Sequence, residues 1–172
     1  MAAMPHAPSS PRATQASDID AQLASADRHC LDHGLRLTSG RKAVLQALLR
    51  RGGTAKAYEL LADLQSGGAS VAPMAVYRSL DFLVAHDIVH KVASNSSFVY
   101  CQHDHHRHHE PSFLICERCG SATEWDAEGC HAVVAQALKA TGFAVHGIEI
   151  QGLCAGCAQT DKLTTPAARG SR

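Results

Sequence analysis

The chain has 172 residues, enough for one large domain or two small ones. Lys and Arg together number 16, as do Asp and Glu, so the formal net charge is zero. This balance argues against a nonspecific polyanion binder but allows a local basic face. Only 5% of the residues are aromatic, so a small domain would have a thin core that a bound metal would help to stabilise. The twelve histidines and seven cysteines likewise indicate metal binding.

The two ends of the chain predict disordered tails, over residues 1–17 and 160–172. The first tail is rich in Ala, Pro and Ser and lacks the apolar region of a signal peptide. No stretch approaches the roughly 20 apolar residues of a membrane span. An odd number of cysteines in an apparently unsecreted chain favours reduced thiols and a cytoplasmic protein.

Four helices are expected between the first tail and residue 86. Ser17 and Asp18 can cap the first, and Thr38 can cap the second. Pro73 is favoured in the first turn of the fourth. Apolar residues recur at helical spacing through the last three. The expected helices cover about 18–33, 40–51, 56–65 and 73–86.

A β-hairpin follows these helices. Residues 88–92 and 98–100 are rich in strand-forming residues, and the polar segment 94–97 lies between them. Helices followed by a two-stranded hairpin form a winged helix-turn-helix, with helix 73–86 as the recognition helix. The sequence therefore predicts a DNA-binding domain over residues 18–101.

The exposed face of the recognition helix is the candidate DNA surface. Arg78 can bond O6 and N7 of guanine, Tyr77 can contact a phosphate or a thymine methyl, and Ala75 permits close approach. Arg41 and Lys42, at the start of the second helix, are expected to hold phosphates. Residues 41–91 contain seven Lys or Arg and four Asp or Glu, an excess of three. An ordinary solvated helix face is the alternative.

A His-rich hinge loop over residues 102–112 leads into a second domain over residues 113–159. Residues 113–115 predict a strand, 127–141 a helix with Val133, Val134 and Leu138 on one face, and 143–153 a strand broken by Gly147. The whole chain is thus expected to be α+β, a winged helix followed by a small α/β dimerisation domain that pairs through exposed strand edges.

Two Cys-x-x-Cys pairs dominate this second domain: Cys116 with Cys119, and Cys154 with Cys157. Each pair presents two thiolates from one turn, and two such turns complete a tetrahedral structural zinc site. Redox dithiols are the alternative, but a redox protein needs one pair in a βαβ unit, which the pattern lacks. Structural zinc can contribute roughly 10–16 kcal/mol of apparent binding free energy to the folding of small modules.

These features together resemble the ferric-uptake-regulator family, over roughly residues 20–158. The resemblance is carried by Leu37-Thr38 with Arg41, by Val76-Tyr77-Arg78-Ser79-Leu80, by Val89-His90-Lys91-Val92 in the wing, and by the segments 113–120 and 152–157 around the cysteines. The wing and the Gly-Leu-Cys-x-x-Cys ending are similar to a zinc-sensing branch. Ala75 and Gly40 depart from the usual Thr and Gln, which bears on the operator sequence.

A sensor also needs a second, weaker metal site between the domains. His90, Cys101, His109 and Glu124 offer one thiolate, two imidazoles and one carboxylate, a plausible tetrahedral zinc set. The resemblance implies regulatory zinc at these same positions. The thiolate of Cys101 favours zinc over iron(II). Each of the four also has a bland interpretation as a surface histidine, a buried free thiol or a solvated carboxylate.

Further histidines offer more donors than one zinc ion needs, and a third metal site is a possible additional feature. Cys30 and Cys130 stand alone and are expected to be core or surface thiols. The additional candidates are His103, His105, His106, His108, His131 and His146.

The resemblance implies a transcriptional repressor that binds palindromic operator DNA as a homodimer loaded with two or more zinc ions per subunit, and that controls zinc homeostasis genes. It implies neither a membrane nor a small-molecule substrate as partner. Two alternatives stay open: a regulator of the same family that senses iron or peroxide, and a zinc-dependent hydrolase. A hydrolase would need an open coordination position and a general base, and no His-Glu-x-x-His helix is present.

Overall fold

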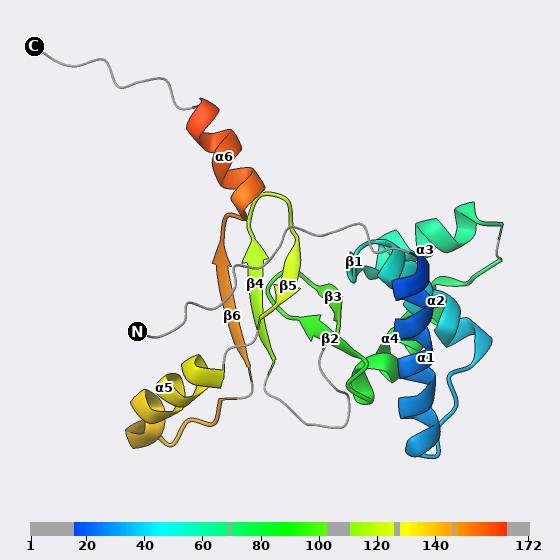
Figure 1. The fold of residues 1–172 in the computed structure, drawn as a ribbon, viewed down its shortest axis with the longest axis horizontal. Coiled ribbons are helices and arrows are strands. Elements are labelled where there is room, and N and C mark those ends of the chain that lie inside the picture. The colour runs from blue at the N-terminus through cyan, green and yellow to red at the C-terminus, as the bar shows by residue number, and fades with distance from the viewer. Residues whose placement is uncertain (1–15, 69, 103–110, 126–127, 146, 165–172) are drawn as a thin grey trace, which may run out of the picture.

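The computed structural model describes residues 16–68, 70–102, 111–125, 128–145 and 147–164, which form two lobes (Figure 1). The N-terminal lobe contains α1 (Ala16–Asp32), α2 (Ser39–Arg50), β1 (Thr54–Lys56), α3 (Ala57–Ser66), α4 (Pro73–Ala85), β2 (Val89–Val92) and β3 (Ser97–Tyr100). The C-terminal lobe contains β4 (Ser112–Cys116), β5 (Ala122–Glu124), α5 (Glu128–Leu138), the 3-10 helix η1 (Lys139–Thr141), β6 (Ile148–Gly152) and α6 (Ala155–Thr164).

Local signals explain where the N-terminal helices begin. Thr38 is the N-cap of α2, and its hydroxyl accepts a hydrogen bond from the Arg41 amide. Glu59 reaches back to the amide of Lys56, the N-cap of α3, at 2.7 Å. Pro73 occupies the first turn of α4, where its missing N–H costs nothing. The four expected helices are therefore present, with bounds that differ by one or two residues.

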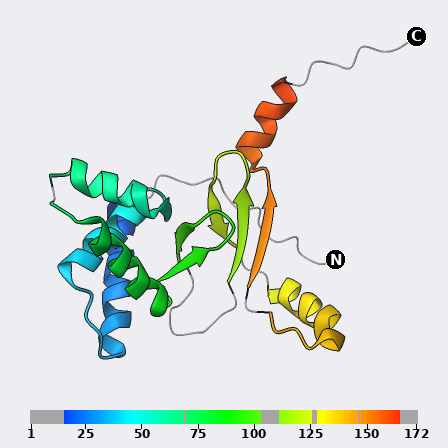
Figure 2. The ribbon, with the colours of Figure 1, turned by 180° about the vertical axis from the view of Figure 1, so that it is seen from behind.

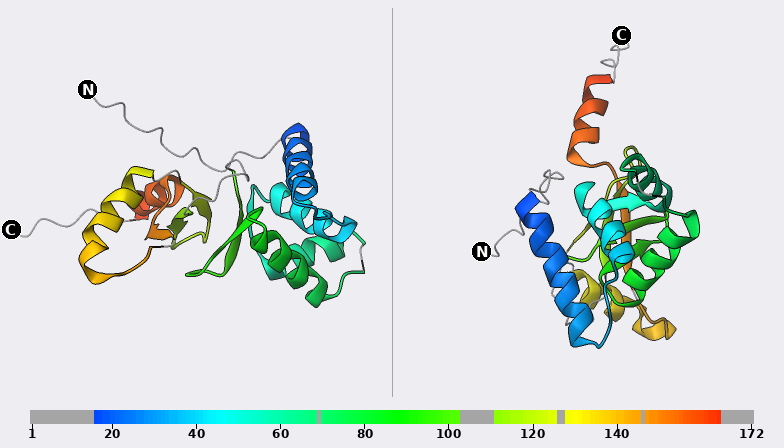
Figure 3. Two further views of the ribbon diagram at one scale, coloured as in Figure 1. Left: turned by 90° about the horizontal axis from the view of Figure 1, so that it is seen from below. Right: turned by 90° about the vertical axis from the view of Figure 1, so that its right-hand side faces the viewer.

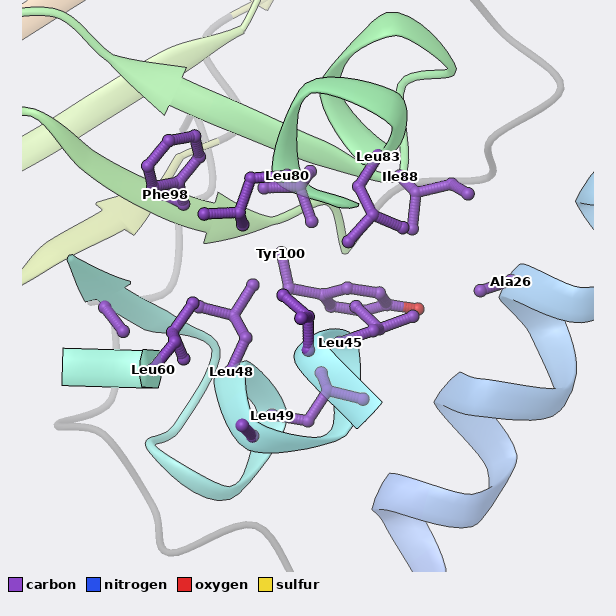
Figure 4. Close-up of a cluster of buried hydrophobic side chains, with 14 of the residues drawn as sticks. Ala26, Leu45, Leu48, Leu49, Leu60, Leu80, Leu83, Ile88, Phe98 and Tyr100 are labelled. Atoms are coloured by element: carbon purple, nitrogen blue, oxygen red, sulfur yellow. The ribbon is translucent and has the colours of Figure 1, made fainter. Parts of the chain in front are cut away.

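One core holds this lobe together, and Figure 4 shows its centre. Leu48 from α2 and Leu80 and Leu83 from α4 are fully buried, and Ala26 closes the cluster from α1. Tyr100 lies among them, and burial raises the pKa of its phenol to about 12, so the ring is neutral. This packing fixes α4 against α2 and leaves its opposite face to solvent.

The wing is a three-stranded antiparallel sheet in the order β1-β3-β2. The predicted hairpin is present, with His90 opposite Val99. The third strand was not predicted. It begins at Thr54, directly after the glycines that end the α2 segment, and pairs Thr54 with Val99. Three residues are too few to show the alternation by which a strand is recognised from sequence.

The C-terminal lobe is built on a second sheet, ordered β5-β4-β6, with β4 parallel to β6 and antiparallel to β5. The expected strand over 143–153 is shorter, and the helix expected over 127–141 ends in η1. Val133 is 68% exposed, so the expected apolar face of this helix is not buried within the chain. The helix α6 continues to Thr164, inside the segment 160–172 that the sequence suggested was a tail.

The two sheets face one another across the lobe boundary (Figures 2 and 3). Val92 and Val99 from the wing form a buried cluster with Phe113, Ile115 and Ala122 from the second sheet. Here the Thr54 hydroxyl also donates to the Ala122 carbonyl at 2.6 Å. One face of the wing sheet thus packs against the C-terminal sheet. None of the described helices is long and apolar enough to cross a membrane.

Candidate metal centres and the exposed helix

The four cysteines of the two Cys-x-x-Cys pairs meet at one end of the C-terminal sheet. Cys116 ends β4 and Cys154 follows β6, and the parallel pairing of these strands brings the two turns together. All four sulfur atoms lie within 4.8 Å of one another, and those of Cys119 and Cys154 are 3.9 Å apart. Zn–S bonds of 2.3 Å in a tetrahedron place sulfur atoms about 3.8 Å apart. The geometry fits a four-thiolate zinc site.

Hydrogen bonds lower the pKa values of two of these thiols, which favours the thiolate form that binds a metal cation. Amides of Cys119 and Cys154 donate toward the Cys116 sulfur and lower the pKa of that thiol to about 6. The Ser121 hydroxyl, 3.2 Å away, lowers the pKa of the Cys119 thiol. The pKa of Cys157 rises to about 12, because its proton is held against the Cys154 sulfur and the neighbouring sulfurs oppose a further negative charge. Such a set binds a divalent cation in place of its protons.

A second cluster lies at the boundary between the lobes. His90 comes from β2, Cys101 follows β3, and Glu124 ends β5. One donor atom from each lies within 4.8 Å of the others, and His90 Nε2 is 3.5 Å from Glu124 Oε1. All three residues are buried, so the alternative interpretation of Glu124 as a solvated carboxylate is wrong.

The donor set of this cluster also fits zinc. Bonds of about 2.0 Å to nitrogen and oxygen in a tetrahedron separate those two atoms by about 3.3 Å, close to the His90–Glu124 separation. The Gln102 amide donates to the second oxygen of Glu124 at 3.1 Å and orients the carboxylate. The fourth predicted ligand, His109, lies outside the described residues, as do His103, His105, His106, His108 and His146.

Three residues that the sequence left open have other neighbours. His131, a candidate for an additional metal site, has its Nε2 2.6 Å from the Ser112 hydroxyl and joins neither cluster found among the described residues. Cys30 is buried in the N-terminal lobe, and burial raises the pKa of its thiol. Cys130 is half-buried on α5.

The face of α4 that points away from the core carries the residues predicted to read DNA. Ala75, Tyr77 and Arg78 are all exposed, while Val76 and Leu80 are buried behind them. Lys42 is exposed on α2. This arrangement matches the expected surface of a recognition helix.

Arg41 differs from the expectation of a freely exposed phosphate contact. Its guanidinium stacks over the ring of Phe82 at 3.4 Å, a cation–π contact, and donates to the Arg36 carbonyl at 2.7 Å. It therefore ties α2 to α4 within the lobe, and a phosphate contact would have to share a guanidinium already engaged with both partners.

Sequence reasoning did not identify two residues, Glu149 and Arg118, that hold segments close to these sites. Glu149 on β6 binds the turn of the wing, and Arg118, inside the first cysteine pair, donates to the Cys157 carbonyl at 3.0 Å. Both contacts join segments more than 30 residues apart and depend on which strands pair. No local pattern in the sequence could have revealed them.

Comparison with known proteins agrees with this architecture. The model of the ferric uptake regulator family matches residues 32–152. The chain is 36% identical, over 146 residues, to the zinc uptake regulation protein of Escherichia coli K12, covering 84% of this chain and 85% of the relative.

Solved structures extend the similarity to three dimensions. A zinc uptake regulator complexed with zinc and DNA superposes with a TM-score of 0.74 at 36% identity, covering 84% of this chain and 97% of the other. Holo XcZur gives a TM-score of 0.70 at 39% identity, covering 81% and 99%. Apo XcZur, at 40% identity and covering 83% and 99%, gives 0.50. At nearly equal identity, the fold described here is thus more similar to the holo form.

Proposed function

The chain belongs to the ferric uptake regulator family, and from this premise we propose that it is a zinc-responsive transcriptional repressor. It binds palindromic operator DNA as a zinc-loaded homodimer and controls genes of zinc homeostasis. The relatives named above bind zinc and DNA or regulate zinc uptake, according to their names. We place the protein in the cytoplasm, where its promoters are.

The observation that carries this proposal is the buried cluster of His90, Cys101 and Glu124 across the lobe boundary. Two of its members belong to the DNA-binding lobe and the third to the C-terminal lobe. A zinc ion held there, with His109 as the fourth ligand, would bridge the two lobes through a soft, tetrahedral donor set. Because Cys101 supplies a soft thiolate ligand, the site would favour zinc over iron(II).

The mechanism is a shift between two arrangements of the lobes. Without an ion, the donor groups of His90, Cys101 and Glu124 would hold the two lobes together less tightly than when all three are bound to one zinc. The lobes then separate more readily, and the two recognition helices of a dimer lose their common spacing. With the bridge, the helices match two half-sites one or more helical turns apart. Metal can change DNA affinity only through its different affinity for the two arrangements.

The four-cysteine site has a different role in this proposal. Cys116, Cys119, Cys154 and Cys157 hold the end of the C-terminal lobe together permanently, and this lobe forms the dimer. Exposed apolar side chains on it, Phe143 and Ile150 among them, leave a surface for a second copy. We propose a structural role for the four-cysteine site, a regulatory role for the cluster of His90, Cys101 and Glu124, and catalysis at neither, because among the described residues neither site offers a general base beside an open position.

Metal-dependent DNA selection tests this function. The zinc-loaded protein would first select its preferred sites from a pool of random duplexes, and its affinity for them would then be measured with zinc, iron(II) or manganese(II). We expect palindromic sites and a response strongest with zinc. A stronger response to iron(II), or no sequence preference with any metal, would reject the proposal. A panel of hydrolase substrates, run on the same samples, tests the alternative of a zinc enzyme.

A further inference from the structure

The tip of the wing hairpin, residues 93–96, is held by the C-terminal lobe at a point separate from either metal cluster. The two oxygens of the Glu149 carboxylate accept hydrogen bonds from the amides of Ala93 and Ser94, at 2.8 and 3.1 Å. Beside them, the Asn95 side chain donates to the Gly120 carbonyl at 3.2 Å. Three consecutive residues of the turn thus contact the other lobe.

Strand pairing explains why Glu149 reaches the wing. Glu149 lies opposite Phe113 in the parallel pairing of β6 with β4. Phe113 is packed against the wing valines, so Glu149 lies on the same face of the sheet as that buried cluster. Burial alone would raise the pKa of this carboxyl, but the hydrogen bonds from Ser94 and Ala93 prevail and lower it. The group is therefore ionised, and its two hydrogen bonds are charge-assisted.

This contact and the buried metal-binding cluster lie at opposite ends of the hairpin. His90 and Cys101 lie toward its base, whereas the amides of Ala93 and Ser94 lie at its tip. The buried cluster of Val92 and Val99 with the second sheet also holds the hairpin, and attachments at its base and its tip restrict rotation about that cluster. The hairpin in turn carries the recognition helix, because Ile88 bonds back to Leu83 at the end of α4.

We propose that Glu149 is a positioning residue for DNA binding: its carboxylate clamps the wing turn and, with the cluster at the hairpin base, sets the direction in which α4 is presented. The clamp is separate from the metal-binding atoms, so its removal leaves the zinc ligands themselves in place. The clamp instead changes how well the zinc-bound arrangement of the two lobes fits DNA, and so the affinity for DNA. The inference rests on the proposed zinc-dependent DNA binding.

The test compares Glu149→Ala and Glu149→Gln with a matched control, Gln151→Ala. Gln151 lies two residues further along the same strand and is exposed. We expect Glu149→Ala to keep the zinc content at saturating zinc and the dimer of the wild type. Its affinity for selected DNA at saturating zinc should fall about two- to tenfold, the size of effect for solvent-exposed hydrogen bonds to a charge. Glu149→Gln, which keeps one acceptor oxygen, should fall between Ala and wild type, and Gln151→Ala should match wild type.

Amide hydrogen exchange provides a readout without DNA. Exchange at Ala93 and Ser94 should accelerate in Glu149→Ala and remain slow in Gln151→Ala. DNA affinity equal to wild type in both Glu149 variants overturns the role of the clamp, and so does tighter binding, since the carboxylate would then be obstructing the wing. A wild type whose DNA binding ignores zinc overturns the proposed function instead, and this inference with it.

Discussion

In the proposed function, Cys101 is the residue on which the choice of metal depends. Its sulfur is buried with His90 and Glu124, so its replacement changes the donor set and leaves the surface as it is. We expect Cys101→Ser to fold, to keep the four-cysteine zinc, and to need at least tenfold more free zinc for DNA binding, because loss of even an outer-shell partner of a metal ligand typically costs about 10–100-fold in metal affinity. Titration of DNA binding against buffered zinc measures this. Cys130→Ser is the control, and a wild-type zinc response of Cys101→Ser would contradict the assignment.

Arg78 carries the predicted base readout. It is exposed on α4 beside Tyr77, and a forked contact to guanine contributes about 1–3 kcal/mol of discrimination. Arg78→Ala should therefore weaken binding to the selected site and reduce the difference between this site and a scrambled duplex. Arg28→Ala, which removes an exposed arginine from α1, controls for the loss of charge. An unchanged preference in Arg78→Ala would exclude this residue from base recognition.

The helix α4 is held in place by the residues packed behind it. Leu80 is fully buried, whereas Met74 on the same helix is 60% exposed. Leu80→Ala should lower the free energy of unfolding by about 2–5 kcal/mol, because it removes buried methyl groups and leaves a cavity. Met74→Ala should change it by about 0.5 kcal/mol or less. Urea denaturation followed by circular dichroism distinguishes the two, and equal effects would show that α4 packs differently.

The two cysteine turns form a second element whose stability is metal-dependent. Replacing one ligand leaves three thiols that no longer satisfy a tetrahedral zinc ion. Cys116→Ser should thus lose the tightly held zinc and disrupt the C-terminal lobe, and the dimer with it. Sedimentation together with zinc analysis checks this expectation. A metal-free variant that stays dimeric and folded would show that the site is dispensable.

The elements differ in how far the sequence could predict them. Helices α2 and α4 were predictable, because caps and apolar spacing are local signals, and so were the four cysteines with their paired spacing. Strands β1 and β5 are three residues each and gain their stability from partners distant in the chain. Burial of Glu124 and the contact of Glu149 with the wing follow from those pairings, so neither could be derived from the sequence alone.

The whole molecule is a pair of lobes, and in the proposed function their relative placement decides whether the protein binds DNA. The apolar cluster across the boundary, the Thr54 hydrogen bond and the wing clamp all favour the placement described here, which is more similar to a holo relative than to its apo form. In the proposed function these contacts share the stabilisation of this placement with the regulatory ion, so we expect the ion to contribute a typical coupling free energy of about 1–3 kcal/mol.

The most direct measurement removes only the weakly held zinc and follows DNA binding. A mild chelator is added to the zinc-loaded dimer, the remaining zinc per chain is counted, and affinity for the selected duplex is measured by fluorescence anisotropy. We predict that about one zinc per chain remains with the four cysteines, the dimer persists, and DNA affinity falls about 5–150-fold until zinc is restored. Undiminished DNA affinity after loss of that zinc would contradict the account.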